Sequence, residues 1–244
     1  MVKKQDLLYE GKAKRIYQTE EADTLWIEYK DEATAFNGKK KDTLVGKAKL
    51  NNEISAQIFM RLADKGIPSH FIRRLSDTEQ LVKPVAIIPL EVVVRNVVAG
   101  SMSKRLGIEE GTALQRPIVE FYYKDDALGD PLITEDHIGL LNAASLEEVD
   151  RLKRMSLEAN EQLIELFDGI NVRLIDFKLE FGRTDDGMIL LADEISPDTC
   201  RLWDKDSDQR FDKDLFRRNI GNLQEGYLEI LTRLLTLSSN DERF

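Results

Sequence analysis

Short apolar runs, broken by glycine and by charged residues, dominate the first thirty positions of the chain. Each run mixes aliphatic with aromatic residues, a composition typical of β-strands. The runs lie at 7–9, 13–17 and 24–29, and Gly11 and the charged stretch 20–23 separate them. The sequence therefore predicts three neighbouring strands at its start.

The spacing of apolar residues then changes to every fourth position, which is the spacing of one buried helix face. It predicts a helix over about 49–65. The apolar positions are Leu50, Ile54, Ile58 and Leu62. A β-rich run follows at 80–98, and the prolines within it, Pro84 and Pro89, predict a sheet edge or a linker between lobes.

The second half of the chain combines helices with one strand pair. Helices are predicted at 101–107, 145–167 and about 213–237. The middle helix begins with Ser145 and Glu148, whose spacing is that of a capping box. Two runs at 172–182 and 187–195 flank an Asp-Asp-Gly turn, so we expect them to form a β-hairpin.

This order of elements, strands and one helix followed by mixed helices and strands, predicts an α+β or α/β protein with a cleft between two lobes. We place the boundary inside the β-rich run. The expected lobes are 1–84 and 85–244, which together form a single compact unit.

Composition narrows the class of protein. The chain has 244 residues, of which 42% are hydrophobic and 33% charged, so collagen-like, low-complexity and disordered classes are excluded. No apolar run approaches the roughly 20 residues that span a bilayer. The single cysteine, Cys200, excludes an intramolecular disulfide, and we see no signal-peptide pattern at the start, so we expect a cytoplasmic protein. Two histidines, His70 and His137, cannot build a histidine-rich zinc site.

Charge is distributed unevenly along the chain. The net charge of −10 argues against a general nucleic-acid-binding protein. Residues 1–50 nevertheless carry 11 Lys and Arg against 9 Asp and Glu. Local basic clusters in an acidic protein suit a small anionic ligand in a pocket, but charge alone favours a solvated charged face.

The first candidate motif is Gly11-Lys12-Ala13-Lys14, between two predicted strands. Glycine lets a backbone approach a phosphate closely, and lysines two residues apart on a strand point to the same side. The motif lacks the Walker pattern and the GxGxxG pattern. An ordinary turn followed by a charged strand is the alternative.

The second candidate follows the long β-rich run. Arg95 precedes small residues and Ser101, where a short helix is predicted to begin. Free backbone N–H groups at a helix start, a hydroxyl and an arginine together suit phosphate binding. The alternative is a surface turn in which Ser101 only caps the helix.

The predicted hairpin carries the third candidate. Along its first strand, Asp176, Lys178 and Glu180 share one face, while the residues between them are apolar and belong to the core. Pairing of Arg183 with Met188 would place Asp193 diagonal to Glu180 on the polar face, and a slip of one residue would turn it away. Two converging carboxylates indicate magnesium carrying nucleotide phosphates, and an ion-pair ladder facing solvent is the alternative.

Two further segments could contribute polar groups. The loop after the hairpin contains Asp198, Arg201 and small hydroxyl residues, which suits a polar substrate. Cys200 lies there as well, but no histidine partner is apparent, so we do not assign it as a nucleophile. One loop contains Asp125, Asp126 and Asp130, which turn chemistry explains adequately, and a share in catalysis is the alternative.

Several motifs in one order resemble a known family. The run from Ile88 to Ser101 and the run from Leu174 to Gly182 are similar to the two signatures of phosphoribosylaminoimidazole-succinocarboxamide synthases (SAICAR synthetases). LYEGKAKRIY at 7–16, SKRLGIEEG at 103–111 and DEISPDTCRLWD at 193–204 also resemble that family. The similarity extends from about residue 7 to 235.

The resemblance implies an α+β, ATP-grasp-like fold of two lobes with nucleotide in the cleft between them. It implies an ATP-dependent ligase of de novo purine synthesis. This enzyme would join L-aspartate to the carboxylate of carboxyaminoimidazole ribonucleotide, through an acyl phosphate, with ATP and Mg²⁺ required. It also implies a homodimer, and neither nucleic acid nor membrane as a partner.

The resemblance also implies roles for individual residues. Those that match the nucleotide phosphate loop are Gly11, Lys12, Ala13 and Lys14, and Lys83 is a further candidate for nucleotide binding. Those that match the metal ligands are Glu180 and Asp193. Those expected to hold substrate are Arg95, Ser101, Lys178, Asp198 and Arg201, and the candidate catalytic residues are Lys178, Asp130 and Arg201. Some members carry an acidic residue where this chain has Asn37, so the role of that position is open.

Two other functions remain compatible with these residues. A small-molecule kinase would use the same nucleotide lobes and stop at phosphoryl transfer. A non-catalytic nucleotide sensor would bind ATP without turnover. The base that deprotonates the aspartate amine also remains open between an aspartate and a substrate phosphate, because neither histidine lies in a matched motif.

Overall fold

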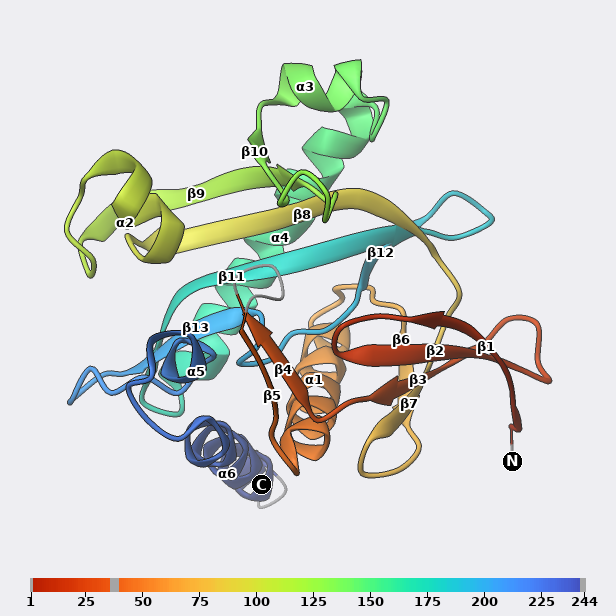
Figure 1. Ribbon diagram of the computed structural model, residues 1–244, viewed down its shortest axis with the longest axis horizontal. Coiled ribbons are helices and arrows are strands. Elements are labelled where there is room, and N and C mark those ends of the chain that lie inside the picture. Colours follow the sequence, from red (N-terminus) through yellow and green to blue (C-terminus); the bar gives the residue numbers. More distant parts are fainter. Residues whose placement is uncertain (1, 36–39, 242–244) are drawn as a thin grey trace.

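The computed structural model describes residues 2–35 and 40–241, folded as two antiparallel sheets with helices packed between and behind them (Figure 1). The N-terminal sheet has the order β1-β2-β3-β7-β6. Its strands are β1 (Lys4–Glu10), β2 (Lys14–Thr19), β3 (Leu25–Tyr29), β6 (Phe71–Arg74) and β7 (Glu79–Val82). A small hairpin of β4 (Glu32–Ala35) and β5 (Lys40–Thr43) precedes helix α1 (Lys47–Asp64).

The second sheet has six strands in the order β10-β9-β8-β11-β12, and β13 pairs with β11. The strands are β8 (Ala86–Val97), β9 (Ala113–Tyr123), β10 (Leu132–Ile133), β11 (Val172–Arg183), β12 (Ile189–Ala192) and β13 (Cys200–Asp204). The helices of this half are α2 (Gly100–Leu106), α3 (Glu135–Leu140), α4 (Leu146–Asp168), α5 (Asp214–Arg218) and α6 (Leu223–Asp241). The predicted α+β class with two lobes is confirmed.

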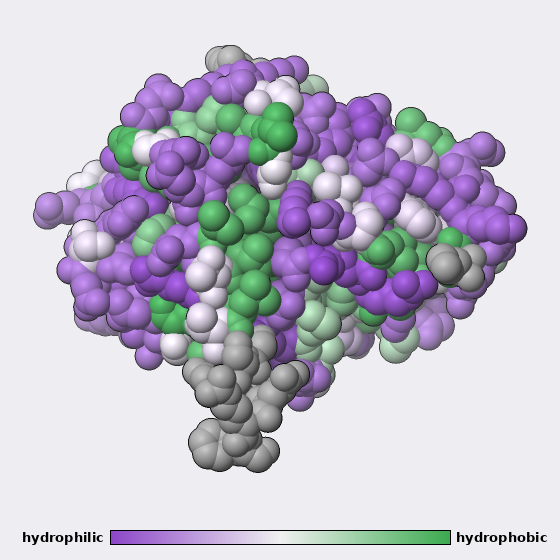
Figure 2. Space-filling view, turned by 90° about the horizontal axis from the view of Figure 1, so that it is seen from below, coloured by the Kyte–Doolittle hydropathy of each residue, from purple (hydrophilic) through white to green (hydrophobic). Residues whose placement is uncertain are grey.

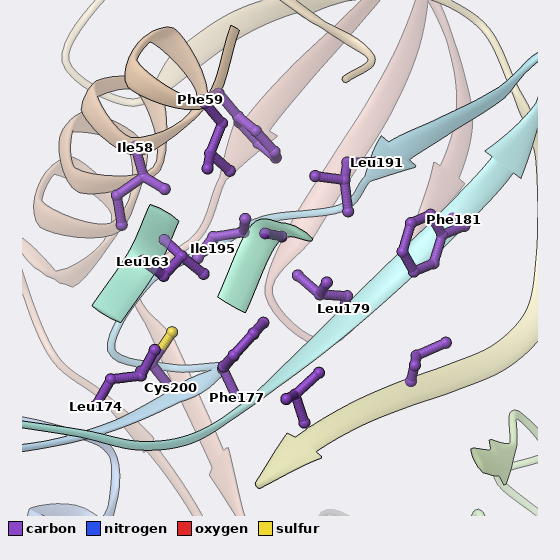
Figure 3. Packing of buried hydrophobic residues seen from close by; sticks show 14 of the residues in the cluster. Ile58, Phe59, Leu163, Leu174, Phe177, Leu179, Phe181, Leu191, Ile195 and Cys200 are labelled. Carbon is purple, nitrogen blue, oxygen red and sulfur yellow. The ribbon is translucent and has the colours of Figure 1, made fainter. Parts of the chain in front are cut away.

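A single large cluster of buried side chains joins the elements around the second sheet. Helix α4 packs against β11 and β8, and helix α1 packs against α6. Figure 3 shows Ile58 and Phe59 of α1 next to Leu163 of α4 and the apolar face of β11. Since α1 precedes residue 84 and shares this core, the division into 1–84 and 85–244 stays a prediction.

The predicted face of β11 is confirmed. Phe177, Leu179 and Phe181 are buried in the core, as the alternation of polar and apolar residues requires. The predicted capping box of α4 is also present, because Glu148 N–H donates to Ser145 Oγ at 3.2 Å and Ser145 N–H donates to Glu148 Oε2 at 2.8 Å. The alternation in β11 and the capping box of α4 both depend on residues close together in the sequence. Both define elements that support the cleft.

Two prolines were predicted to mark a sheet edge or a linker. Pro84 does lie in the segment that joins β7 of the first sheet to β8 of the second, whereas Pro89 lies inside β8 and marks no linker. The pairing of β8 with β9 begins at Leu90, and its pairing with β11 extends past Pro89. The pairing with β11 shifts register there, from Glu91 opposite Glu180 to Ile87 opposite Gly182. A proline is tolerated at such a bulge because the bulged residue needs no ladder N–H.

The predicted hairpin register is wrong by one residue. Arg183 pairs with Ile189 rather than with Met188, so alternation alone would turn Asp193 away from the cleft. Asp193 instead follows the last residue of β12 and has φ of 60°, in the left-handed region. The alternation of side chains between the two faces therefore stops at Ala192. Asp193 lines the cleft because of its left-handed backbone, which strand periodicity does not predict.

The predicted helix over 213–237 is two helices. Helix α5 ends at Asn219, which has φ of 53°, and α6 begins at Leu223. Asparagine tolerates the left-handed conformation that closes a helix, and a glycine follows at 221. The break gives α5 a direction of its own. Among residues 2–35 and 40–241, no helix combines the length and the apolarity needed to cross a bilayer.

Candidate active site

A cleft of about 690 Å³ lies between the two sheets and takes side chains from both. It is lined by the turn after β1, by β8, β9 and β11, by the segment after β12, and by α5. The predicted site residues that line it are Gly11, Lys12, Ala13, Lys14, Arg95, Ser101, Asp130, Lys178, Glu180, Asp193, Asp198 and Arg201. Residues far apart in the sequence thus meet in one place.

Two positions that the sequence analysis singled out do not join them. Lys83 is exposed in the segment that leads from β7 to β8, and it does not line the cleft. Its backbone N–H donates to the carbonyl of His70 at 2.7 Å. Asn37 lies outside the described residues.

The turn between β1 and β2 positions two lysines differently. The turn closes because Gly11 N–H donates to Lys14 C=O at 2.8 Å. The Lys14 side chain is only 10% exposed, and its Nζ lies 2.6 Å from Asp193 and 3.1 Å from Glu194. The Lys12 side chain is 48% exposed and pairs with the exposed Asp126 at 2.6 Å. Carboxylates of the protein therefore hold the Lys14 ammonium in one position, whereas the exposed Lys12 side chain can adjust its position.

Electrostatics keeps the Lys14 pair ionised. Burial by itself would lower the pKa of Lys14, but the charges of Asp193 and Glu194 outweigh it and raise that pKa above its usual range. Burial would likewise raise the pKa of Asp193, and Lys14 and Lys178 outweigh it and hold that pKa well below its usual range. The carboxylate of Asp193 therefore stays negative.

A row of alternating charges follows the polar face of β11. Lys178 Nζ lies 2.8 Å from Glu91 and 2.9 Å from Glu180. Lys124, from the segment after β9, donates to both oxygens of Glu180 at 2.9 and 2.8 Å. Burial would lower the pKa of Lys178, but the charges of Glu180, Glu91 and Asp193 outweigh it and raise the pKa. The lysines therefore remain cations.

The predicted metal ligands, Glu180 and Asp193, face this one cleft with lysines on their oxygens. Within the described residues, no group of three or more His, Cys, Asp and Glu side chains is placed to hold a metal ion. Carboxylate oxygens are nevertheless the ligands that Mg²⁺ prefers, and one or two of them suffice when substrate phosphates complete the coordination. The donor set fits a cation that enters with phosphate, and not an all-protein metal site.

A buried network holds the arginines of the second candidate motif. Asp176 accepts from Arg95 Nη1 at 2.7 Å and from Arg201 Nη1 at 2.9 Å. Arg95 also donates to Glu120 at 2.7 Å and to Ser101 Oγ at 3.1 Å. Arg95 and Arg201 thus share one carboxylate, and the Ser101 hydroxyl lies next to them. This arrangement suits an anion with several oxygens.

Gly100 allows Arg201 to reach this position. A Cβ at Gly100 would lie 2.3 Å from Arg201 Nη2 and 2.6 Å from Arg201 Cζ. Gly100 also has φ of 54°, a conformation that favours glycine. The Arg201 guanidinium therefore packs directly on the backbone at the start of α2.

Asp198, predicted to hold substrate, is itself held by three donors. Its Oδ2 lies 2.8 Å from Lys47 Nζ and 3.2 Å from Lys213 Nζ, and Tyr227 donates to its Oδ1. Burial would raise the pKa of Asp198, but Lys213 and Lys47 outweigh it and hold the pKa well below its usual range. Asp198 is thus an anion that fixes lysines around the cleft.

Two other predicted positions have simpler roles in the structure. Asp130 lines the cleft, has φ of 49° and accepts from the backbone N–H of Asp125 at 3.0 Å, which stabilises its own turn. Burial raises the pKa of the Cys200 thiol, so the thiol stays protonated. The structure thus agrees with leaving Cys200 out of the nucleophiles.

Several cleft residues were not predicted from the sequence. They are Glu91, Lys124, Glu194, Lys213 and Arg217. Lys124 had a usable signal, because Glu120, Tyr122 and Lys124 follow at two-residue spacing along β9 and its end. Lys213 and Arg217 had none, since the break between α5 and α6 decides which way they face.

Comparison with known proteins places the chain among enzymes of one kind. A family model described as SAICAR synthetase matches residues 7–234. A phosphoribosylaminoimidazole-succinocarboxamide synthase from Shouchella clausii is 74% identical over 231 residues, which cover 95% of this chain and 97% of that protein. One from Halalkalibacterium halodurans is 66% identical over 233 residues, which cover 96% of this chain and 98% of that protein.

Solved structures give the same picture. The synthase from Ehrlichia chaffeensis superposes with a TM-score of 0.92 at 48% identity, over 94% of this chain and 98% of that chain. A SAICAR synthetase in complex with ADP superposes with a TM-score of 0.91 at 46% identity, over 94% of this chain and 97% of that chain. The family model, which matches residues 7–234, includes all the described residues that line the cleft.

Proposed function

The chain belongs to the SAICAR synthetase family, and from this membership we propose a role for each part of its cleft. It is an ATP-dependent ligase of purine synthesis, which joins L-aspartate to carboxyaminoimidazole ribonucleotide and releases ADP and phosphate. The observation that carries the proposal is the meeting of two charged groups in one cleft. A row of lysines and carboxylates along β11 lies next to an arginine pair on Asp176.

The turn after β1 is the proposed nucleotide site. Gly11 and Ala13 leave the backbone accessible to phosphate oxygens, and Lys14 and Lys12 supply positive charge. Lys14 is fixed by two carboxylates, so it needs little reorganisation when the triphosphate arrives. Lys83 is exposed and does not line the cleft, so its role in nucleotide binding is proposed from the sequence alone.

Arg95, Ser101 and Arg201 are the proposed site of the ribonucleotide. Their shared carboxylate, Asp176, orients both guanidinium groups toward the cleft. Lys178, Asp198 and Asp130 line the same cleft, and Lys178 bonds to Glu91 and Glu180. Lys178 is thus placed to stabilise negative charge on the carboxylate that is activated.

The reaction needs activation because a carboxylate repels nucleophiles and its oxide is a poor leaving group. Transfer of the γ-phosphoryl group to that carboxylate gives an acyl phosphate, and the aspartate amine then displaces phosphate to form the amide. Lys14, Lys124 and Lys178 stabilise the charge that moves with the phosphoryl group. Glu180 and Asp193 would hold Mg²⁺, which supplies charge neutralisation on the phosphates when bound.

Neither histidine is placed to take the amine proton. His70 and His137 do not line the cleft, and His137 caps α3. The proton acceptor is therefore proposed to be an aspartate of the cleft or an oxygen of a substrate phosphate.

Product formation from defined components tests this function. ADP release and succinocarboxamide product are followed with ATP, magnesium and carboxyaminoimidazole ribonucleotide, with and without L-aspartate. Product that requires all four components is the expected result. ADP without aspartate, accompanied by a stable phosphorylated product, would support a small-molecule kinase instead. Absence of turnover in verified folded protein would support a nucleotide sensor.

Conservative amide substitutions test the proposed metal carboxylates. Glu180→Gln and Asp193→Asn each keep shape and remove a charge. We expect turnover to fall at least about tenfold, which corresponds to a barrier increase of about 1.4 kcal/mol. Steady-state rates at saturating magnesium measure the effect. Wild-type rates in either variant would contradict the role of the hairpin carboxylates as metal ligands.

We also propose a cytoplasmic homodimer. A single buried free cysteine suits a reducing compartment. Figure 2 shows apolar side chains gathered in a strip on the face seen from below, and Met60 of α1 and Leu228 of α6 are exposed. Burial of such surface favours association. Sedimentation at micromolar concentration should give twice the mass of the chain, and a monomer there would disprove the dimer.

A further inference from the structure

Among the described residues that line the cleft, two cations have no part in the roles assigned so far. Lys213 directly precedes α5, and Arg217 lies one helical turn later, so both side chains lie on the same side of this short helix. Both line the cleft, with side chains 13% and 29% exposed. They are therefore accessible to a ligand and largely enclosed by protein.

The carboxylates beside them are shared among several cations. Asp198 Oδ2 lies 2.8 Å from Lys47 and 3.2 Å from Lys213, so one oxygen serves two ammonium groups. Asp214 accepts from Arg217 at 2.8 Å, from Arg201 at 3.0 Å and from Arg210 at 3.3 Å. Two carboxylates thus face five cations, although Arg210 and Arg201 have further acidic partners and the buried Asp212 directly precedes Lys213. Lys213 and Arg217 therefore each share their carboxylate with other cations.

Neighbouring cations oppose the positive charge of Lys213. Burial lowers the pKa of Lys213, and the neighbouring Lys47 and Arg217 lower it further, against the opposing charge of Asp198. A carboxylate that docks between Lys213 and Arg217 would relieve this repulsion. The site is therefore built to gain free energy from an added anion.

Neighbouring structure holds the two cations in place. The buried Asp212 accepts from Leu202 N–H at 2.9 Å and from Asp214 N–H at 2.7 Å, and so ties the start of α5 to β13. Lys213 N–H donates to the carbonyl of Pro197 at 3.0 Å. The positions of the charged groups are thus set before any ligand binds, which is what selective recognition requires.

We propose that Lys213 and Arg217 bind the two carboxylates of the amino-acid substrate and thereby select a dicarboxylic amino acid. This proposal rests on the proposed function. The other cations that line the cleft within the described residues are assigned: Lys12 and Lys14 to the nucleotide, Lys124 and Lys178 to phosphoryl transfer, and Arg95 and Arg201 to the ribonucleotide. Lys213 and Arg217 are specificity residues that touch the substrate outside its reacting amine.

Substrate analogues that lose one carboxylate at a time provide the test. L-asparagine replaces the side-chain carboxylate by an amide, and L-aspartic acid α-amide replaces the other. In the wild type, each replacement should lower kcat/KM at least about tenfold, since it removes a charge-assisted bond. In Lys213→Met and Arg217→Met, KM for L-aspartate should rise about tenfold or more, and one of the two amide penalties should shrink by about the same factor.

Three controls separate this role from a structural one. KM for ATP and KM for the ribonucleotide should change less than about threefold, because those sites keep their own cations. Arg217→Lys keeps a positive charge and should retain most of the selectivity against the amides. Arg218→Met removes the next side chain of α5, which is 45% exposed, pairs with Glu110 and does not line the cleft, so it should behave as the wild type.

The outcomes distinguish failure of this inference from failure of the function. Amide penalties that stay at the wild-type size in both Met variants would overturn the inference, while the wild type still makes product. Equal penalties in Arg217→Lys and Arg217→Met would also overturn it, because charge would then not be the property that matters. Absence of product with wild-type protein would instead overturn the ligase function on which the inference rests.

Discussion

Lys14→Met is expected to lower kcat/KM for ATP about 100-fold or more, the size found when one preorganised charge is removed from a site of charge transfer. Lys14 is nearly buried and bonded to Asp193 and Glu194, so no flexible neighbour can replace its charge at the phosphate turn. Its loss also leaves two carboxylates facing the position of the triphosphate, and their repulsion adds to the effect. Initial rates over a range of ATP concentrations measure it.

Lys12→Met is the matched control for that experiment. Lys12 belongs to the same turn but is half exposed, and its partner Asp126 is exposed as well. We expect a loss of about tenfold or less, because water screens an exposed pair. Lys14→Arg, which keeps the charge, should recover part of the activity, and thermal melting must show that Lys14→Met remains folded. Equal losses in Lys12→Met and Lys14→Met would show that burial of Lys14 does not matter.

The face of β11 could be predicted because its cause is local. Side chains of a strand alternate between two faces, so the apolar Phe177, Leu179 and Phe181 had to take the core and leave their neighbours to the cleft. The capping box at Ser145 is local in the same sense. In both cases, interactions among a few adjacent residues are enough to determine the local structure.

Asp193 shows where such reasoning stops. The register of the hairpin differs by one residue from the prediction, which should have removed Asp193 from the site. The left-handed backbone of Asp193 turns its side chain back into the cleft. The prediction that Asp193 belongs to the site was therefore correct, although the predicted register was not. A single non-glycine residue with positive φ has no periodic signature, and only the contacts around it make that conformation stable.

The α5 side of the cleft could not be predicted for a different reason. Lys47, Lys213 and Tyr227 come from three segments that meet only on Asp198. The apolar pattern favoured one continuous helix over 213–237, and the break at Asn219 depends on packing of Leu215 and Phe216 against the rest of the chain. Contacts between distant segments carry no spacing that a single sequence reveals.

Gly100→Ala is expected to lower kcat/KM for the ribonucleotide about 100-fold, because a displacement of about 1 Å at a binding group can have that effect. The new Cβ would lie 2.3 Å from Arg201 Nη2, so the guanidinium must leave its position against α2. Arg201 would then lose its bonds to Asp176 or Asp214, and the phosphate-bearing substrate would lose a cation. KM for the ribonucleotide should rise, and KM for ATP should change little.

The same substitution also strains the backbone, since Gly100 has φ of 54°, and the two effects must be separated. Gly107→Ala does this, because Gly107 closes the same helix with φ of 65° and a Cβ there would meet no atom within 4 Å. Both variants should lose about 1 kcal/mol of unfolding free energy. Only Gly100→Ala should lose activity, and equal activity in the two variants would mean that Arg201 does not depend on the space that glycine leaves.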